Sequence, residues 1–290
     1  MIARTDLALE RHEQHGGQSP DGVRMQTERQ KDAVITKIEI LDETGARALE
    51  KPVGTYYTIE TDGFPDSQLI RDGRLQAVTQ ALRQLLPEKG PVLVAGLGNP
   101  EITPDALGPK CADLVFATRH IDDETRRTLS LPRLREVSVI APGVTGQTGL
   151  EAVEVVTGVC ARVRPAAVIA VDALAAASVK RLAKTVQLSD AGIEPGSGVG
   201  NARRALNAET LGVPVIAVGV PTVVDALSLA QDVFGEEAQA DEEDKRQYAS
   251  MIVTPRETDT VTHAAARLLA LAINCALQPE LEGEELLALM

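Results

Sequence analysis

Two aspartates, each following an apolar run, are the residues of this chain best placed to do chemistry. Residues 92–95 are entered through a proline and are predicted to form a buried parallel strand, and Asp105 follows them in the first turn of a predicted helix. Residues 166–171 form a second apolar run, which ends in Asp172. Because the carboxyl ends of parallel strands share the edge of an α/β sheet where active sites form, we expect both acids at that edge.

A pair of carboxylates at one site would have a defined chemistry. Two neighbouring carboxylates cannot both ionise cheaply, so they share a proton and divide into an acid and a base. Such a pair activates a water molecule for attack on an amide. An aspartate at a helix start is also a common cap, because it accepts hydrogen bonds from free backbone amides and meets the positive end of the helix dipole. The two residues alone leave capping and catalysis open.

Two glycine-rich segments resemble nucleotide-binding loops only in part. Gly96-Leu-Gly98 begins like a dinucleotide fingerprint, but Glu101 stands at the third glycine position. Residues 196–198 (Gly-Ser-Gly) fail in the same way, and neither segment matches a P-loop. We expect the second segment to form a flexible surface loop near the cleft, with backbone amides able to stabilise an oxyanion. That loop comprises Gly196, Gly198, Gly200 and Asn201.

The composition is that of an acidic protein with a large core. The chain has 290 residues, of which 44% are hydrophobic, enough for one domain. Its formal net charge is −13 and only 2% of its residues are aromatic. An acidic chain with few stacking side chains is a poor candidate for direct nucleic-acid binding.

Cysteine usage and the lack of long apolar runs predict a cytoplasmic protein. The three cysteines are widely spaced and form no C-x-x-C pattern, which favours a reducing compartment. Residues 1–30 are polar and charged, and the apolar runs are too short or too interrupted to span a bilayer, so we expect neither a signal peptide nor a membrane partner. Cys111 and Cys160 fall in apolar helical stretches and are predicted to be buried fillers rather than nucleophiles.

The hydrophobic pattern predicts an α/β fold: a single domain with a mostly parallel central sheet and helices on both faces. Residues 33–40 and 55–60 are expected to form an early strand pair. Further strands are predicted at 92–95, 137–140, 168–171, 185–188 and 213–218, and helices at 69–86, 104–116, 149–163, 172–183 and 260–276. The acidic run 235–246 is predicted to be a solvated loop.

A set of short motifs follows one order along nearly the whole chain. They occupy residues 4–10, 96–99, 103–109, 118–120, 141–144, 171–176, 195–201, 211–217, 219–226 and 253–255. Together they resemble the germination protease family of spore-forming bacteria. Asp105 and Asp172 stand where that family has its two essential aspartates. The acidic run 235–246 is shorter than the corresponding insertion of relatives, and the role of that insertion stays open.

The resemblance implies an endopeptidase that degrades small acid-soluble spore proteins during germination. It implies a homotetramer in the forespore cytoplasm, made as a zymogen that removes its own N-terminal piece. The family cuts between an acid and Leu-Ala, and Asp6-Leu7-Ala8 fits that pattern. We therefore expect a pro-segment of residues 1–6 and a single peptidase domain of residues 7–290.

An acidic residue before the cut needs a cationic partner, ideally an arginine, which can fork onto a carboxylate. The candidates near the motifs are Arg119, Lys180, Arg181, Arg203 and Arg204, and His120 is a further possible substrate contact. Within the aspartate pair, we expect Asp105 to be the general base, because helix-start amides favour its charged form, and Asp172 to hold the shared proton.

Two alternatives remain at this stage. The fold also resembles hydrogenase-maturation peptidases, which use two acids and a histidine around nickel. The chain has four histidines, His12, His15, His120 and His263, and none lies between Asp172 and His263, where the third ligand is expected. Two carboxylates alone make a poor zinc site, so we expect no metal and no cofactor. A non-enzymatic binding domain is the other alternative.

Overall fold

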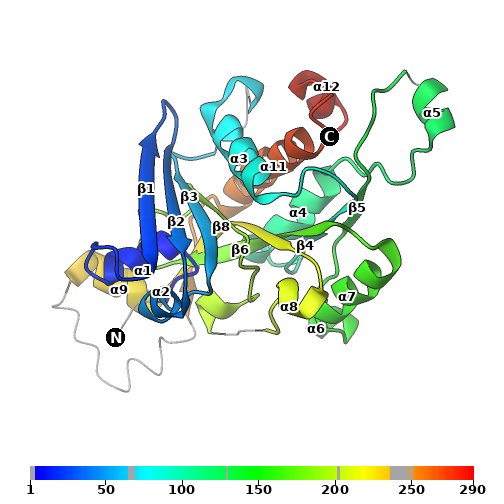
Figure 1. Cartoon of the computed structure of the whole chain (residues 1–290). Coiled ribbons are helices and arrows are strands. Elements are labelled where there is room, and N and C mark those ends of the chain that lie inside the picture. Colours follow the sequence, from blue (N-terminus) through cyan, green and yellow to red (C-terminus); the bar gives the residue numbers. More distant parts are fainter. Residues whose placement is uncertain (1–3, 65–68, 129, 201–202, 236–247, 249–250) are drawn as a thin grey trace.

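The apolar runs of the sequence assemble into one mixed β-sheet (Figure 1). The computed structural model describes residues 4–64, 69–128, 130–200, 203–235, 248 and 251–290. The strands are β1 (Val23–Arg29), β2 (Val34–Ile40), β3 (Gly54–Glu60), β4 (Val92–Gly96), β5 (Val137–Ile140), β6 (Ala167–Ala176), β7 (Thr185–Ser189), β8 (Val215–Asp225) and β9 (Ile252–Val253).

Helices and short 3-10 turns connect these strands. The helices are α1 (Ala8–Gln14), α2 (Glu43–Leu49), α3 (Gly73–Leu85), α4 (Leu107–Leu114), α5 (Asp123–Thr128), α6 (Thr145–Thr148), α7 (Ala152–Val163), α8 (Ala208–Leu211), α9 (Ala226–Phe234), α11 (Thr258–Leu277) and α12 (Gly283–Ala288). The 3-10 turns are η1 (Leu69–Arg71), η2 (Thr103–Asp105) and η3 (Ser197–Val199).

The sheet has a parallel part and an antiparallel part. Its strand order is β1-β2-β3-β7-β8-β6-β4-β5, and β9 pairs with β8 off this path. The neighbours within β8-β6-β4-β5 are parallel, whereas β1-β2-β3-β7-β8 is antiparallel throughout. The expected α/β class is confirmed, and the parallel strand pairs are β8-β6, β6-β4 and β4-β5.

Helices cover both faces of the parallel part, as the sequence predicts. Val92 and Val94 of β4 pack into a core with α3, α4 and α11, while Leu93 and Ala95 pack into a second core with α7. Neighbouring residues of one strand therefore enter different cores, because successive side chains point to opposite faces. Figure 1 shows α3, α4 and α11 above the sheet and α7 and α8 below it. Burial on both faces explains why β4 has no polar residue.

One helix, α11, is long and apolar enough to cross a membrane by length and composition, contrary to the expectation that every apolar run is too short or interrupted. In the folded chain, 72% of the apolar stretch of α11 is buried inside the protein. Its leucines and alanines fill the larger core against α3 and α4, so α11 serves here as a core helix.

The predicted elements around Asp172 need a correction. The sequence analysis ends a strand at Val171 and starts a helix at Asp172, but β6 continues through Asp172 to Ala176. The run 173–176 is alanine-rich and favours a helix locally, yet it pairs with β8 as far as Ala176 and Val224. Leu174 and Ala176 are also buried in a small apolar cluster. This packing keeps the segment extended, although its residues favour a helix locally.

Other differences are smaller. The predicted helix 104–116 is divided into η2 and α4, β8 is longer than predicted, and β1 is an additional strand on an edge of the sheet. The early pair β2 and β3 is confirmed as antiparallel. The acidic run 236–246 lies outside the described residues. Residues 1–3 also lie outside them, and the division at residue 6 stays a prediction.

Candidate functional site

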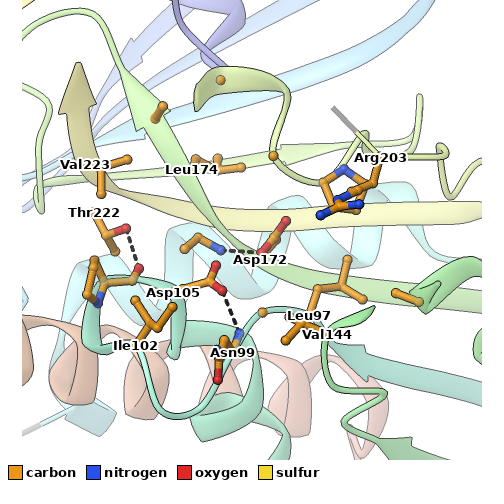
Figure 2. A pocket seen from close by; sticks show the side chains of 18 of the residues that line it. Leu97, Asn99, Ile102, Asp105, Val144, Asp172, Leu174, Arg203, Thr222 and Val223 are labelled. Atoms are coloured by element: carbon orange, nitrogen blue, oxygen red, sulfur yellow. Dashed lines mark hydrogen bonds between the residues drawn. The ribbon is translucent and has the colours of Figure 1, made fainter. Parts of the chain in front are cut away.

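A cavity of about 480 Å³ lies at the carboxyl end of β4, where the sheet edge was expected to hold the active site. The turn after β4, the outer part of β6, the end of β8 and the glycine-rich loop around η3 line it. Asp105 and Asp172 both border this cavity, and Figure 2 shows them near each other at its centre. The structure therefore brings together the two acids that lie far apart in sequence; below we call them the aspartate pair.

Asp105 is positioned by the chain reversal between β4 and α4. Gly98 adopts a φ of +112°, and a Cβ on it would lie 2.0 Å from the Asp105 carbonyl oxygen, so only glycine fits there. The Asn99 backbone N–H donates to Asp105 Oδ2 at 2.6 Å. From β8, Thr222 Oγ1 donates to the Pro104 carbonyl at 2.7 Å and fastens the turn that carries Asp105. Thr222 is a positioning residue that the sequence analysis did not single out.

Asp172 lies on β6 just beyond the end of the neighbouring strand β4. The last paired residues of β4 and β6 are Gly96 and Val171, so Asp172 is the first residue of β6 beyond its neighbour. Its side chain is 4% exposed and its Oδ1 accepts the Ala173 backbone N–H at 2.9 Å. Asp172 therefore lies on a central strand just past the end of the neighbouring strand, and it borders the cavity there.

The electrostatics distinguish the two acids. Burial, then the charges of Asp105 and Asp6, raise the pKa of Asp172 well above its ordinary value. Burial also raises the pKa of Asp105, although the Asn99 N–H opposes this. The expectation that backbone amides would favour the charged form of Asp105 overall is therefore wrong, because desolvation outweighs the hydrogen bond. Because Asp172 is buried and faces two carboxylates, it holds a proton more strongly than Asp105 does.

Asp6 is a third carboxylate at the same cavity, which sequence reasoning did not place there. Its backbone N–H donates to the Ala175 carbonyl at 2.9 Å, and its Oδ2 accepts the Ala175 N–H at 2.8 Å. Ser197 Oγ donates to Asp6 Oδ1 at 2.8 Å. The Asp6 carbonyl accepts from Gln187 Nε2 at 2.7 Å. The predicted cut site therefore lies against β6, close to the aspartate pair.

The residues on either side of Asp6 are also held. Leu7 is fully buried in an apolar cluster with Leu174, Ala176, Leu182 and Val224. On the other side, a Cβ on Gly200 would lie 2.5 Å from Arg4 Nη1, so the glycine-rich loop packs closely on the segment before the predicted cleavage site. The prediction that this loop lies near the cleft is supported for Gly196 and Gly198, which line the cavity. Asn201 lies outside the described residues.

The structure separates the six candidate substrate contacts. Arg203 and Arg204 line the cavity and are exposed; Arg203 Nη1 lies 3.4 Å from Glu151 Oε1. The remaining candidates lie elsewhere. The Arg119 N–H donates to the carbonyl of Val137, the first residue of β5, which places Arg119 and His120 at the opposite edge of the sheet.

The two cations that follow β6 are also remote from the cavity. Lys180 is exposed and does not border it. Arg181 is bound to three carboxylates, Glu10, Glu13 and Glu60, and so fastens α1 to the sheet. Arg181 is thereby a structural residue rather than a free cation for a substrate.

The cysteines and histidines do not gather at the cavity. Cys111 and Cys160 are buried free thiols, and burial raises the pKa of each, as expected for fillers. Within the part of the chain that the structure describes, no group of three or more His, Cys, Asp or Glu is arranged to hold a metal ion. His120, the histidine considered as a further ligand, is exposed at the far sheet edge.

Comparison with known proteins defines the class as peptidases. The chain is 40% identical over 314 residues to the germination protease of Caldanaerobacter subterraneus subsp. tengcongensis, covering 98% of this chain and 96% of that protein. It is 38% identical to that of Clostridium perfringens strain SM101 (98% and 97%) and 34% identical to that of Priestia megaterium (98% and 94%). The sequence profile of the germination protease family matches residues 2–247. The chain belongs to the germination protease family.

Among solved structures, the chain matches the NiFe hydrogenase maturation protease HycI from Thermococcus kodakarensis KOD1. The match covers 65% of this chain and 98% of that chain, at 17% sequence identity and a TM-score of 0.35.

Proposed function

We propose that this protease is an endopeptidase that begins the degradation of small acid-soluble spore proteins during germination, using water activated by Asp105 and Asp172. The observation that carries the mechanism is the convergence of two carboxyl groups on one cavity: the buried Asp172 of β6 and the partly buried Asp105 of the turn after β4. Family membership supports peptide-bond hydrolysis and is at odds with a purely binding role.

In this mechanism the two carboxyl groups have different roles. Asp105, the less buried acid, takes a proton from the attacking water, and the resulting hydroxide adds to the carbonyl carbon of the substrate. Asp172, which keeps its proton more strongly, donates it toward the leaving amide nitrogen. A coupled pair titrates as a unit, so exchange of the two roles is an outcome that kinetics with single variants can reveal.

Cleavage of a purified small acid-soluble spore protein, with and without a chelator, tests the function. We expect cleavage that the chelator leaves unchanged, because the two carboxyl groups supply both acid and base. Loss of cleavage on chelation and its return with added divalent metal would establish the metal-dependent alternative instead. Absence of cleavage under both conditions would contradict the proposed function.

We also propose that the chain is a zymogen that cuts its own Asp6–Leu7 bond. Asp6 already borders the cavity, which supports delivery of this bond to the aspartate pair. Because Leu7 is fully buried, the bond must leave the apolar cluster before it is cut, so we expect slow processing. Intact-mass measurement after incubation at mildly acidic pH should show a new chain beginning at Leu7. A persistent full-length chain, or a different new terminus, would contradict this.

The remaining assignments follow the family resemblance and are proposals. Three free cysteines fit a reducing cytoplasm, here that of the forespore. We propose a homotetramer, for which exposed apolar side chains around α9 and β9, among them Phe234, Met251 and Ile252, offer contact surface. Arg203 and Arg204, the two candidate cations at the cavity, would favour acidic substrates electrostatically.

A further inference from the structure

The outer part of β6 has an open edge beside the aspartate pair. β4 pairs with β6 only as far as Val171, while β6 continues along β8 to Ala176. On the side that β4 has left, the Ala175 N–H and C=O bind Asp6 rather than a strand of the sheet. An exposed strand edge is a place where an extended peptide can add by main-chain hydrogen bonds. The first residues of the chain occupy this edge in part.

The carboxylate of Asp6 is bound there by donors on two sides. The backbone N–H of Ala175 donates to one oxygen at 2.8 Å, and the Ser197 hydroxyl donates to the other at 2.8 Å. Gly198 leaves the space that the group fills, because a Cβ on it would lie 2.2 Å from Asp6 Oδ2. We call these groups of Ala175, Ser197 and Gly198 the carboxylate cradle.

A second cavity, of about 250 Å³, lies beside the cradle and is bordered by a lysine amine. Asp6, Ser197 and Lys51 all line it. Burial lowers the pKa of the Lys51 amine, and the charge of Asp6 is the strongest influence that opposes this and favours the charged form. Lys51 makes no ion pair within 4 Å among the residues that the structure describes. Asp6 therefore lies between the aspartate pair on one side and an unpaired cation on the other.

We propose that the carboxylate cradle is the subsite that reads the acidic residue before the cleaved bond, first in this chain at Asp6 and then in substrates. This inference rests on the proposed endopeptidase function and assigns its acid specificity to Ser197 and the Ala175 N–H, with Lys51 as the supporting charge. An acid satisfies both donors, because each carboxylate oxygen accepts. A glutamine or asparagine has one accepting oxygen for the Ala175 N–H, and its N–H₂ would donate to the Ser197 hydroxyl instead of accepting from it. Both hydrogen bonds would then be neutral, and so weaker than those to a carboxylate.

The test compares two synthetic peptides that differ only in Glu or Gln before a Leu-Ala bond. Each is given to the self-processed protein as wild type and as Ser197→Ala, Gly198→Ala, Lys51→Met, Arg204→Ala and Ser178→Ala. Ser178→Ala is the matched control, because its hydroxyl contacts Asp232 on the surface and does not border either cavity. The readout is the ratio of kcat/KM for the Glu peptide to that for the Gln peptide.

We expect Ser197→Ala to lower this ratio by about 10-fold, the effect of one hydrogen bond to a charged group, mainly through the Glu peptide. Lys51→Met should lower it less, since its charge acts at longer range, and Ser178→Ala should leave it unchanged. In Ser197→Ala a water molecule can take the place of the lost hydroxyl and reduce the effect. Gly198→Ala is therefore the second test: its methyl group fills the cradle, and it should lower kcat/KM for the Glu peptide more than for the Gln peptide.

Two outcomes separate this inference from the proposed function. If the wild type prefers Glu, and the preference survives in Ser197→Ala and Gly198→Ala but is lost in Arg204→Ala, the cradle is not the acid-reading subsite although the endopeptidase function stands. If the wild type cleaves neither peptide and no spore protein, the proposed function fails, and the subsite assignment fails with it.

Discussion

Asp105→Asn and Asp172→Asn are each expected to reduce cleavage of substrate, and of the Asp6–Leu7 bond, by about 10²- to 10⁴-fold, the contribution typical of a general acid or base. Asparagine keeps the shape of each side chain and the oxygen that accepts the Asn99 or Ala173 N–H, but it cannot exchange a proton. Initial rates on a peptide containing Glu-Leu-Ala, and intact mass for self-processing, measure the two losses.

Asp225→Asn is the matched control for both variants. Asp225 is also a buried aspartate in a family motif, but it is the N-cap of α9, where it accepts the Ser228 N–H at 2.9 Å. Asp225 is therefore a capping residue, and asparagine caps helices nearly as well. Activity close to wild type in either Asp105→Asn or Asp172→Asn would exclude the paired mechanism. A loss found only in Asp225→Asn would mean that the catalytic acid was assigned to the wrong strand.

Periodicity and turn chemistry were sufficient for much of the fold but not for the strand that carries Asp172. The apolar run of β4, the helix α7 and the pair β2 and β3 follow from local pattern. The alanines after Asp172 favour a helix locally, and only their pairing with the distant β8 keeps them extended. Strand pairing across many residues is a tertiary effect that a local window does not contain.

Some residues of the candidate site could also be predicted from local sequence pattern, whereas others are placed only by tertiary contacts. The rule that parallel strands end at one edge predicts that Asp105 and Asp172 lie together, and both border one cavity, although Asp172 lies within its strand rather than at the end. Asp6 reaches the same cavity by contacts with Ala175 and Ser197, across most of the chain, and no spacing in the sequence indicates this. Arg119 was a candidate by proximity to a motif, but the chain after α4 returns to the far end of β5.

Replacing the ionisable group of Asp172 should also make the protein more stable at neutral pH. Burial and the neighbouring Asp105 and Asp6 raise the pKa of Asp172 well above its ordinary value of 3.8. In the unfolded chain this carboxyl group loses its proton as the pH rises through that value, whereas the folded protein holds the proton to higher pH. The unfolded state therefore binds fewer protons in this window, and the free energy of unfolding of the wild type falls as the pH rises.

Asp172→Asn cannot ionise at this position and so escapes that loss. We expect its melting temperature to exceed that of the wild type at pH 7, and the difference to shrink toward zero as the pH is lowered below about 4, where both states of the wild type are protonated. Thermal unfolding across this pH range, with Asp225→Asn as a control that removes a cap carboxylate instead, measures it. A lower melting temperature for Asp172→Asn at pH 7, with no convergence in acid, would contradict a desolvated Asp172. A more stable and inactive variant is the expected result, because an acid buried beside other acids is retained for its chemistry at a cost in stability.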